Sequence, residues 1–478
     1  MTTSARTMDE IYQERKLLKH VRDNVHGNIF LEPIFLKFVD TQQFQRLRDL
    51  KQLGLTHMVY PGAVHSRFEH SLGVYWLAGK AVDIIKRYQG PELGIEHSDV
   101  LTVKLAGLLH DIGHGPFSHT FERQFLPQLL SGYPWFTLFQ QGYIHHGSSR
   151  VMSHEDMSVK MIDYVVDEHN IDIDHEILKK AKEMIIASPD RPSQREKQFL
   201  YDIVANGRSG IDVDKFDYIV RDTRACGLGC SFQPDRLMET MQVVGDEICY
   251  RSKNYLTIHK LFATRADLHR TVYAHAKVKA IELMVVDALV KANPYLSLTS
   301  SIHEPSEFWK LDDSILKTIE TSTGKELKES RDLILRIRRR DIYQFCNEFS
   351  VPKERLEHFR GITPQDIVCS QVTNGITLKE DDVAVCNVKI DLTCGKENPL
   401  ERIKFFKDYG GDQEKFPIAE DRISHLLPAF YEDMIVRVYS KRPELVGDVS
   451  AAFENYQLKT FGRKAQVHET PNKKKRRK

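Results

Sequence analysis

Apolar residues recur every three or four positions along most of the chain, which is the spacing of helices that bury one face. The clearest such stretch follows residues 66–69 (Ser-Arg-Phe-Glu), which have the form of a capping box. Leu72, Trp76, Ala81 and Ile85 then continue at helical spacing. The pattern therefore predicts a helix that begins near residue 70.

Further helices are predicted on both sides of the chain's midpoint. One starts at Ser98 or Asp99, is apolar on one face, and stops at residues 113–116, which contain two glycines and a proline. Helical periodicity resumes over residues 199–222 and 258–295.

Other segments have a different pattern. Residues 19–39 predict a short strand or hairpin followed by a helix, and residues 131–150 and 186–198 have the composition of loops. After about residue 370 the pattern changes to short β-rich pieces such as 382–392. We therefore predict a mainly α fold, a helical core with a smaller mixed α/β C-terminal lobe.

Composition narrows the class of protein. The chain has 478 residues, 41% hydrophobic and 28% charged, with a net charge of +1. These values are typical of a folded globular protein without a global field for nucleic acid or membranes. The start is polar and no long apolar run occurs, so we expect an intracellular protein without membrane contact.

Cysteines and the C-terminal run refine this expectation. The seven cysteines are scattered, which favours reduced thiols, and Cys226 and Cys230 lack the second pair that a zinc site needs. Residues 473–478 (Lys-Lys-Lys-Arg-Arg-Lys) are typical of a nuclear import signal or a phosphate-binding arm, with a solubilising tail as the alternative.

Histidines and aspartates form the strongest chemical signal. His70, the His110-Asp111 pair and Asp214 supply two imidazoles and two carboxylates, a mixture that suits Mn, Fe, Zn or Ni better than Mg or Ca. Adjacent residues do not share a helix face, so His110 and Asp111 can meet one ion only where their helix ends. Residues 113–116 predict that end. A satisfied surface or core group is the alternative for each histidine taken alone.

The predicted helix over residues 211–223 separates polar from apolar side chains. At about 100° per residue, four polar residues fall within roughly a quarter of its circumference. They are Asp214, Lys215, Tyr218 and Asp222. A second polar stripe, able to reach phosphates and an aromatic base, repeats at i, i+4 and i+8 in Arg265, His269 and Tyr273. A solvated amphipathic face is the alternative interpretation.

Several longer motifs carry a specific resemblance over roughly residues 19–460. They are Asp40-Thr-Gln-Gln-Phe-Gln-Arg-Leu-Arg48, Gln52-Leu-Gly54, Tyr60-Pro-Gly-Ala63, Arg67-Phe-Glu-His-Ser-Leu-Gly73, His110-Asp-Ile-Gly-His-Gly-Pro-Phe-Ser-His119 and Gly210-Ile-Asp-Val-Asp-Lys-Phe-Asp-Tyr218. The sequence resembles the HD superfamily of phosphohydrolases, and within it the SAM-and-HD-domain-containing deoxynucleoside triphosphate triphosphohydrolases. The residues before the HD motifs already match the family's regulatory segment, so no SAM domain is expected.

The resemblance implies a metal-dependent reaction that converts a dNTP to a deoxynucleoside and inorganic triphosphate. The implied metal ligands are His70, His110, Asp111 and Asp214, holding Fe, Mn or Zn, with Mg accompanying the nucleotide phosphates. His119 would be a general acid toward the leaving oxygen, with His114 beside the triphosphate and His154 nearby. In the family an aspartate partners the last histidine, and here Glu122, a longer carboxylate, takes its place.

The resemblance also implies contacts for each part of the substrate. Arg67, Lys215 and Arg265 would hold the triphosphate, and His269 and Tyr273 would lie near the phosphates and the base. Gln52 and Asp222 match contacts to the sugar 3′-hydroxyl, and Tyr218 matches the ring that stacks on the sugar. Leu53 would lie under C2′, where a ribose hydroxyl would be crowded.

Regulation is implied by a third set of residues. Asp40, Gln45 and Arg48 match a GTP site between subunits of a homo-oligomer, expected to be a tetramer. A second, dNTP-accepting site would use Val59, Tyr60, Arg236, Arg251, Lys253 and Lys407, and Lys19 and Arg340 are further allosteric residues. Asn28, Thr271 and Gln344 depart from the family pattern.

Together these expectations divide the chain into a lead-in (1–18), a regulatory segment (19–65), an HD core (66–370), a C-terminal lobe completing the regulatory sites (371–460) and a basic tail (461–478). We expect a nuclear protein that controls dNTP pools, with weak single-stranded nucleic-acid binding as a further expectation. The alternatives are an HD phosphodiesterase or 5′-nucleotidase, and a nucleic-acid-binding protein with a vestigial HD site.

Overall fold

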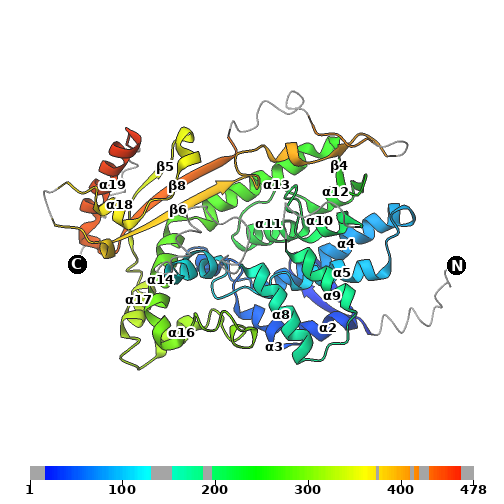
Figure 1. The fold of residues 1–478 in the computed structure, drawn as a ribbon, viewed down its shortest axis with the longest axis horizontal. Helices are drawn as coiled ribbons and strands as arrows, with labels where there is room; N and C mark the ends of the chain where they lie inside the picture. Colours follow the sequence, from blue (N-terminus) through cyan, green and yellow to red (C-terminus); the bar gives the residue numbers. More distant parts are fainter. Residues whose placement is uncertain are drawn as a thin grey trace.

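Helices make up most of the described chain, and the sheets are small (Figure 1). The computed structural model describes residues 17–130, 153–186, 196–372, 376–409, 414–418 and 430–464. The expected loops at 131–150 and 186–198, the lead-in and the basic tail lie wholly or mainly outside these residues. Within them, we find no helix whose length and apolar character would let it cross a membrane.

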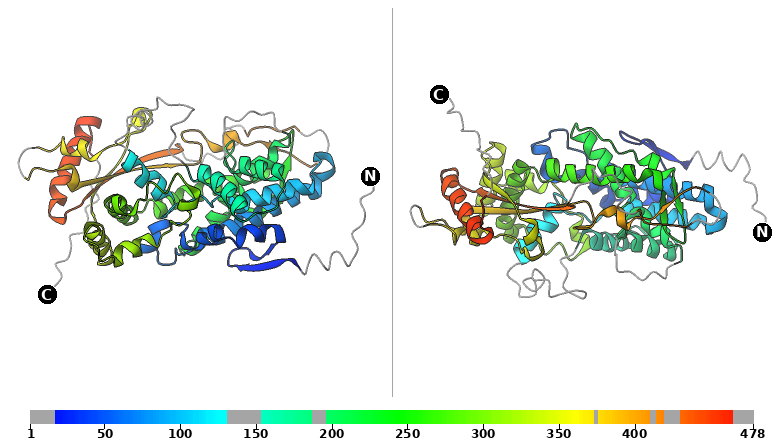
Figure 2. Two further views of the ribbon diagram at one scale, coloured as in Figure 1. Left: turned by 60° about the horizontal axis from the view of Figure 1, so that its bottom comes forward. Right: turned by 90° about the horizontal axis from the view of Figure 1, so that it is seen from above.

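The N-terminal part is a β-hairpin followed by short helices. Strands β1 (Lys19–Asp23) and β2 (Gly27–Leu31) pair antiparallel, as the turn residues predict. The short helices are α2 (Pro33–Val39), α3 (Gln42–Gln45) and the 3-10 turns η1 (Arg46–Asp49) and η2 (Gly54–Met58). Figure 2 shows the hairpin, in dark blue, lying along the edge of the helical core.

Two long helices organise the core. Helix α4 (Arg67–Leu93) packs against α5 (His97–Leu109) and α11 (Val213–Ala225). Helix α4 begins three residues before its predicted start. The Ser66 side chain makes no bond to the helix backbone, because its hydroxyl donates to the Glu69 carboxylate.

The remaining helices surround this core. They are α6 (Leu126–Leu130), α8 (His154–Glu168), α9 (His175–Ile185), α10 (Tyr201–Val204), α12 (Pro234–Met238), α13 (Tyr255–Leu268), α14 (Ala276–Leu296), α15 (Pro305–Phe308), α16 (Ile315–Thr321), α17 (Lys328–Arg338), α18 (Pro364–Val368) and α19 (Val446–Phe461). Two π-helical turns, η3 (Phe121–Phe125) and η6 (His269–Tyr273), occur among them.

Two three-stranded sheets form the later part of the chain. Strands β3 (Met241–Val243), β4 (Ile248–Arg251) and β7 (Phe405–Phe406) make the first, and β7 is parallel to β4. Strands β5 (Gln344–Ser350), β8 (Glu432–Ser440) and β6 (Val383–Asp391) make the second, in that order. The expected mainly α fold with a small mixed lobe is confirmed. The lobe's sheet nevertheless recruits β5, which precedes the expected boundary at residue 370.

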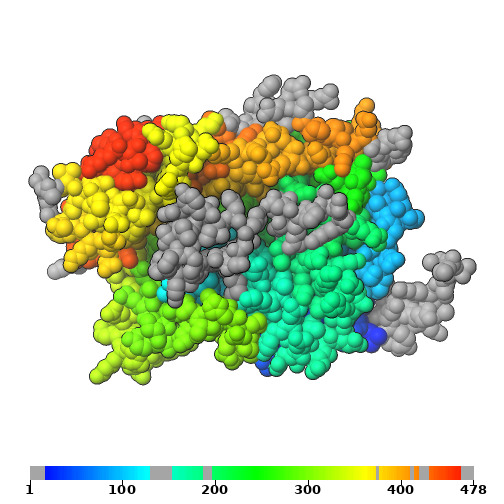
Figure 3. Space-filling model, in the orientation of Figure 1, coloured from blue at the N-terminus to red at the C-terminus, as the bar shows by residue number. Residues whose placement is uncertain are grey.

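The C-terminal lobe shares one hydrophobic core with the helices and has a second of its own. Leu392, Leu400 and Phe405 belong to the main core, whereas Val436 and Phe453 belong to a smaller cluster beneath α19. The later part of the chain, orange to red in Figure 3, covers one side of the helical core.

The end of α5 is fixed by close backbone contact. A Cβ on Gly113 would lie 2.2 Å from the Ser158 backbone nitrogen, so α8 can approach only a glycine here. Beyond it, Phe117 and Ser118 both have positive φ values, 58° and 56°. Non-glycine residues with this backbone conformation need support from their surroundings, which places a constrained turn directly before His119.

Candidate active site

Three helices bring together the side chains expected to bind metal. His70 lies in the first turns of α4, His110 and Asp111 directly follow α5, and Asp214 lies in the first turn of α11. His70 Nε2 is 3.3 Å from His110 Nε2, 3.1 Å from Asp214 Oδ1 and 3.4 Å from Asp111 Oδ2. His110 Nε2 is 3.5 Å from Asp111 Oδ1 and 3.6 Å from Asp214 Oδ1.

The separations among His70 Nε2, His110 Nε2 and Asp214 Oδ1 fit one ion, and Asp111 lies beside this group. Donor atoms about 2.1 Å from a metal, at angles of about 90–109°, lie about 3.0–3.4 Å from one another. The tautomers fit as well, because His70 Nδ1 is 2.7 Å from Asp217 Oδ2 and His110 Nδ1 is 2.9 Å from the Gly107 carbonyl. Each ring thus donates through Nδ1 and keeps the Nε2 lone pair for a ligand bond. The group is suited to a divalent metal.

Asp217 is a buried anchor that the sequence interpretation missed. It is fully buried, and besides His70 it contacts Arg221 Nε at 2.8 Å and His26 Nε2 at 2.6 Å. Arg221 in turn donates to Asp23 at 2.8 Å, so the β1–β2 hairpin reaches the metal ligands. The signal available in sequence was the spacing of Asp217, three residues after Asp214.

A glycine makes room for this anchor. A Cβ on Gly73 would lie 1.9 Å from Asp217 Oδ1 and 2.6 Å from Arg221 Nη2. Gly73 is the last residue of the Arg67–Gly73 motif, so the motif contains both a metal ligand and the space for that ligand's support.

The site has a strong preference for positive charge. Burial lowers the pKa of His70, but its hydrogen bonds to Asp214 and Asp217 raise that pKa to about 10. Burial opposes ionisation of Asp111, yet Arg67 and the neighbouring histidines hold the pKa of Asp111 well below its usual range. A metal ion can supply the same positive charge that these carboxylates attract as a proton.

Glu122 joins two of the predicted catalytic histidines. Its Oε1 is 2.6 Å from His119 Nδ1, and its Oε2 is 2.9 Å from His154 Nδ1. The π-helical turn η3 points this long carboxylate back toward both rings. Burial opposes the charge on His154, but its bond to Glu122 raises the pKa of His154, so this ring favours a proton.

His114 completes a three-histidine cluster that is better suited to proton handling than to metal binding. Its ring stacks on His154 at 3.9 Å with an angle of 16° between the planes, and its centroid is 5.1 Å from that of His119. The ligand atoms of the three rings lie close enough for an ion. The in-plane lone pairs of two stacked rings run side by side, however, and a tetrahedral site needs lone pairs that converge.

Each of the three cations expected to hold phosphates has an acidic partner. Arg67 donates to Asp111 and, at 2.9 Å, to Ser118 Oγ. Lys215 Nζ is 2.8 Å from Asp212 Oδ2. Arg265 donates to the carbonyl and the carboxylate of Asp391 at 2.8 and 3.3 Å.

The residues expected at the nucleoside end also cluster. Tyr273 donates to Asp222 Oδ2 at 2.6 Å, and His65, which the sequence interpretation missed, contacts Asp222 Oδ1 at 2.7 Å. Gln52 is 9% exposed, and its Oε1 has no hydrogen-bond partner among the described residues. Its backbone N–H donates to the His65 carbonyl at 3.0 Å. Leu53 follows, packed against the main core.

Nearby, burial lowers the pKa of Arg265, but a hydrogen bond with Tyr218 helps to raise that pKa above its usual value. His269 packs edge-on to Tyr273 at 4.9 Å, and burial lowers its pKa to about 3.

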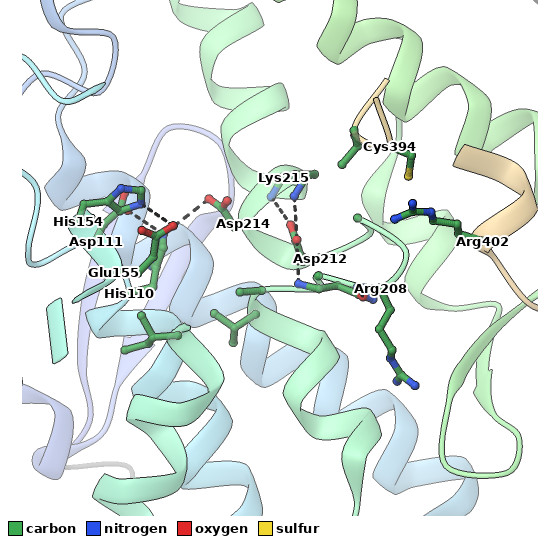
Figure 4. A pocket seen from close by; sticks show the side chains of 17 residues that line it. His110, Asp111, His154, Glu155, Arg208, Asp212, Asp214, Lys215, Cys394 and Arg402 are labelled. Carbon is green, nitrogen blue, oxygen red and sulfur yellow. Dashed lines mark hydrogen bonds and ion pairs between the residues drawn. The ribbon is translucent and has the colours of Figure 1, made fainter. Parts of the chain in front are cut away.

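A cavity of about 290 Å³ opens beside the metal ligands (Figure 4). His110, Asp111 and Asp214 line one end. Its other walls include Arg208 from the loop before α11, Lys215 from α11 itself, and Thr393, Cys394 and Arg402 from the C-terminal lobe. Arg208 and Arg402 were not among the predicted site residues.

Comparison with known proteins assigns the family. The HD domain family model matches residues 67–217, and the HD associated region matches residues 232–367. The deoxynucleoside triphosphate triphosphohydrolase SAMHD1 homolog of Dictyostelium discoideum is 40% identical over 448 residues, which are 93% of this chain and 82% of that protein. This chain belongs to the SAMHD1 family.

Vertebrate members of the SAMHD1 family are similar over comparable lengths. The deoxynucleoside triphosphate triphosphohydrolase SAMHD1 of Gallus gallus is 34% identical over 486 residues, covering 93% of this chain and 75% of the relative. That of Homo sapiens is 33% identical over 462 residues, covering 89% and 71%.

The expected regulatory residues of this SAMHD1 family member lie apart from the metal ligands. Arg48 is exposed, donates to Gln45 Oε1 at 2.8 Å and lies 3.5 Å from the centroid of the Phe68 ring. Asp40 is exposed at the end of α2.

The residues of the second expected site fall into separate groups. Tyr60 donates to the Thr271 carbonyl at 2.9 Å, and Arg340 donates to the Met58 carbonyl at 3.0 Å, which brings it close to Val59. Arg251 pairs with Phe406 in the first sheet, so Lys407, the residue after Phe406, lies near Arg251. Lys253 is two residues after Arg251. Among the expected allosteric residues outside the GTP site, five have exposed side chains: Lys19, Arg236, Lys253, Arg340 and Lys407.

We predict that Asp217→Asn weakens metal binding by about 10- to 100-fold, because His70 loses the carboxylate that orients it. Metal affinity is measured by competition with a chelator. Asp287→Asn is the matched control, since Asp287 also accepts two side-chain bonds, from Tyr343 and Lys441, away from the site. Equal affinity in Asp217→Asn and the control would contradict the anchoring role.

A second prediction concerns pH. Glu122 raises the pKa of His154, so this contact stabilises the protein at low pH and is lost as pH rises through the raised pKa. Glu122→Gln should lower that pKa, because the His154 ring loses its carboxylate partner. NMR titration of His154 tests this, with Glu176→Gln on the exposed surface of α9 as control. An unchanged His154 titration would refute the assignment.

Proposed function

We propose that this protein hydrolyses deoxynucleoside triphosphates to deoxynucleosides and inorganic triphosphate. The observation that carries the proposal is a metal-binding group of His70, His110 and Asp214, with Asp111 beside it, at a cavity lined by cations. The family relationship supports it, since the relatives named above are deoxynucleoside triphosphate triphosphohydrolases.

The metal is proposed to be Fe, Mn or Zn, because two imidazoles and two carboxylates suit a borderline ion. Held by His70, His110, Asp111 and Asp214, it would polarise the α-phosphate and lower the pKa of a water. Mg would accompany the phosphates.

The remaining steps belong to the chain's own side chains. Arg67, Lys215 and Arg265 would neutralise the triphosphate, exchanging their carboxylate partners for phosphate oxygens as it binds. His119 would give a proton to the departing 5′-oxygen. Phosphate charge beside His119 favours its protonated form, and Glu122 links it to the proton on His154. His114 would stay neutral in the stack, because burial holds its pKa well below the usual range.

The nucleoside end supports a deoxyribose substrate. The unpartnered Gln52 Oε1 and the Asp222 carboxylate can accept hydrogen bonds from a 3′-hydroxyl. Tyr218 would stack on the sugar, with His269 and Tyr273 toward the phosphates and the base. Leu53 offers no partner for a 2′-hydroxyl, and a site that leaves such a group buried and unpaired discriminates against ribonucleotides.

Regulation is proposed to act through nucleotide-driven assembly. Asp40 would accept the hydrogen bonds of a guanine edge, while Arg48 would hold phosphates. GTP that binds only the assembled state shifts the population toward it, toward a tetramer in our proposal. The second, dNTP-accepting site would use the separate groups around Tyr60 and Arg251. Through this control the enzyme would set cellular dNTP levels.

The basic run at 473–478 is proposed to direct the protein to the nucleus and to contribute weak single-stranded nucleic-acid binding. It lies outside the described residues.

Product analysis tests the reaction. With each of the four dNTPs, mass spectrometry should find a deoxynucleoside and triphosphate, and His110→Ala should lose both turnover and bound metal. His175→Ala, on the exposed end of α9, is the matched control and should behave like the parent. Release of phosphate from monophosphates would instead indicate a 5′-nucleotidase. Salt-sensitive nucleic-acid binding without hydrolysis, unchanged in His110→Ala, would indicate a vestigial site.

Assembly is tested separately. Arg48→Ala should lose GTP-stimulated turnover and GTP-dependent growth in oligomer mass while it keeps its metal. Arg87→Ala, an exposed arginine on α4, is the control. A GTP activation curve for Arg48→Ala that overlays the parent's would leave the proposed regulatory site without support.

A further inference from the structure

Arg46 is a buried arginine between two of the proposed activator residues. It begins the turn η1, directly after Gln45 and two residues before Arg48, and its side chain is 5% exposed. Gln45 and Arg48 point outward and contact each other. Arg46 points the other way, into the protein.

Its guanidinium binds backbone carbonyls of the loop that carries the catalytic histidines. Nη2 is 2.5 Å from the His114 carbonyl, and Nη1 is 3.3 Å from the Ile112 carbonyl. Nε donates to the Leu311 carbonyl at 2.8 Å, and the guanidinium carbon lies 5.1 Å from the centroid of the Phe308 ring. The planar donor fork therefore joins three segments at once, which a lysine ammonium cannot reproduce.

A second set of bonds holds the same loop a few residues later. Asp313 accepts the Phe117 backbone N–H at 2.7 Å and the Lys51 backbone N–H at 2.9 Å. Ser118 Oγ donates to the Lys51 carbonyl at 2.9 Å. The left-handed backbone at Phe117 and Ser118 is thus supported by Asp313 and by Lys51, which Asp313 also binds, and a buried constrained turn persists only with such support.

We propose that Arg46 is a positioning residue that fixes the 112–119 loop, and so the placement of His114 and His119, from the regulatory segment. This inference rests on the proposed function, because those histidines act in the proposed reaction. His70, Asp214 and several of the proposed nucleotide contacts lie on α4, α11 and α13, and His110 and Asp111 come before the carbonyls that Arg46 binds. Loss of Arg46 should therefore slow turnover without weakening nucleotide or metal binding.

The test compares Arg46→Lys with Arg331→Lys. Arg331 also donates to two backbone carbonyls, of Ser322 and Gly324, but lies away from the site. Arg46→Lys should lower kcat by about 10- to 100-fold, with KM and metal content close to the parent's. Amide hydrogen exchange over residues 112–119 should be faster than in the parent. Arg331→Lys should leave kcat and exchange in that loop unchanged.

Two outcomes would overturn the proposal. One is parent-like kcat and parent-like loop exchange in Arg46→Lys. The other is a fall in kcat that is matched by an equal loss of metal or by a raised KM. If the parent hydrolyses no dNTP, the proposed function fails, and exchange in the loop alone decides the role of Arg46. If Arg46→Lys does not fold, Asp313→Asn is tested in its place, because it weakens the contact that holds the same loop at Phe117. The expected and the contradicting results for kcat, KM, metal content and exchange are the same.

Discussion

A carboxylate sealed from water must have its oxygens hydrogen-bonded, and Asp217 meets this requirement with one group from its own helix and two from distant segments. His70, Arg221 and His26 all contact it, and the arginine is held by Asp23 in turn. An uncompensated buried charge costs several kcal/mol, so α4, α11 and the N-terminal hairpin are held in one arrangement. This arrangement fixes the positions of the metal-site side chains on these helices.

The metal ligands themselves could be predicted from sequence because each lies in a compact motif. His110 and Asp111 adjoin a glycine-rich helix end, and Asp214 lies on a helix whose polar face is evident from spacing alone. The support of His70 could not be predicted in this way. His26 is separated from Asp217 by 191 residues, and no local periodicity reports a contact over that distance. The expected helices are confirmed because their signals are local.

The sequence singled out Glu122 as the partner of His154 but could not predict how its carboxylate is oriented. The longer carboxylate put its pairing with His154 in doubt, but the π-helical turn at 121–125 lets the two oxygens serve two histidines. Strand pairing was equally hard to foresee, because β5 joins β8 across more than eighty residues of chain. Arg208 and Arg402 gave no signal, since exposed arginines are common and only the folded chain brings them to one cavity.

The wall that the C-terminal lobe contributes has a consequence for how the chain divides. The matched family regions end at residue 367, yet Thr393, Cys394 and Arg402 line the cavity, and Asp391 holds Arg265. Thr393 also packs against Gly210, where a Cβ would lie 2.5 Å from its methyl carbon. A fragment ending at residue 367 would retain His70, His110 and Asp214 but would lose this wall of the cavity. The lobe thus helps to set the polarity around the reacting groups. Loss of the lobe at the family boundary, in evolution or by engineering, would change that polarity.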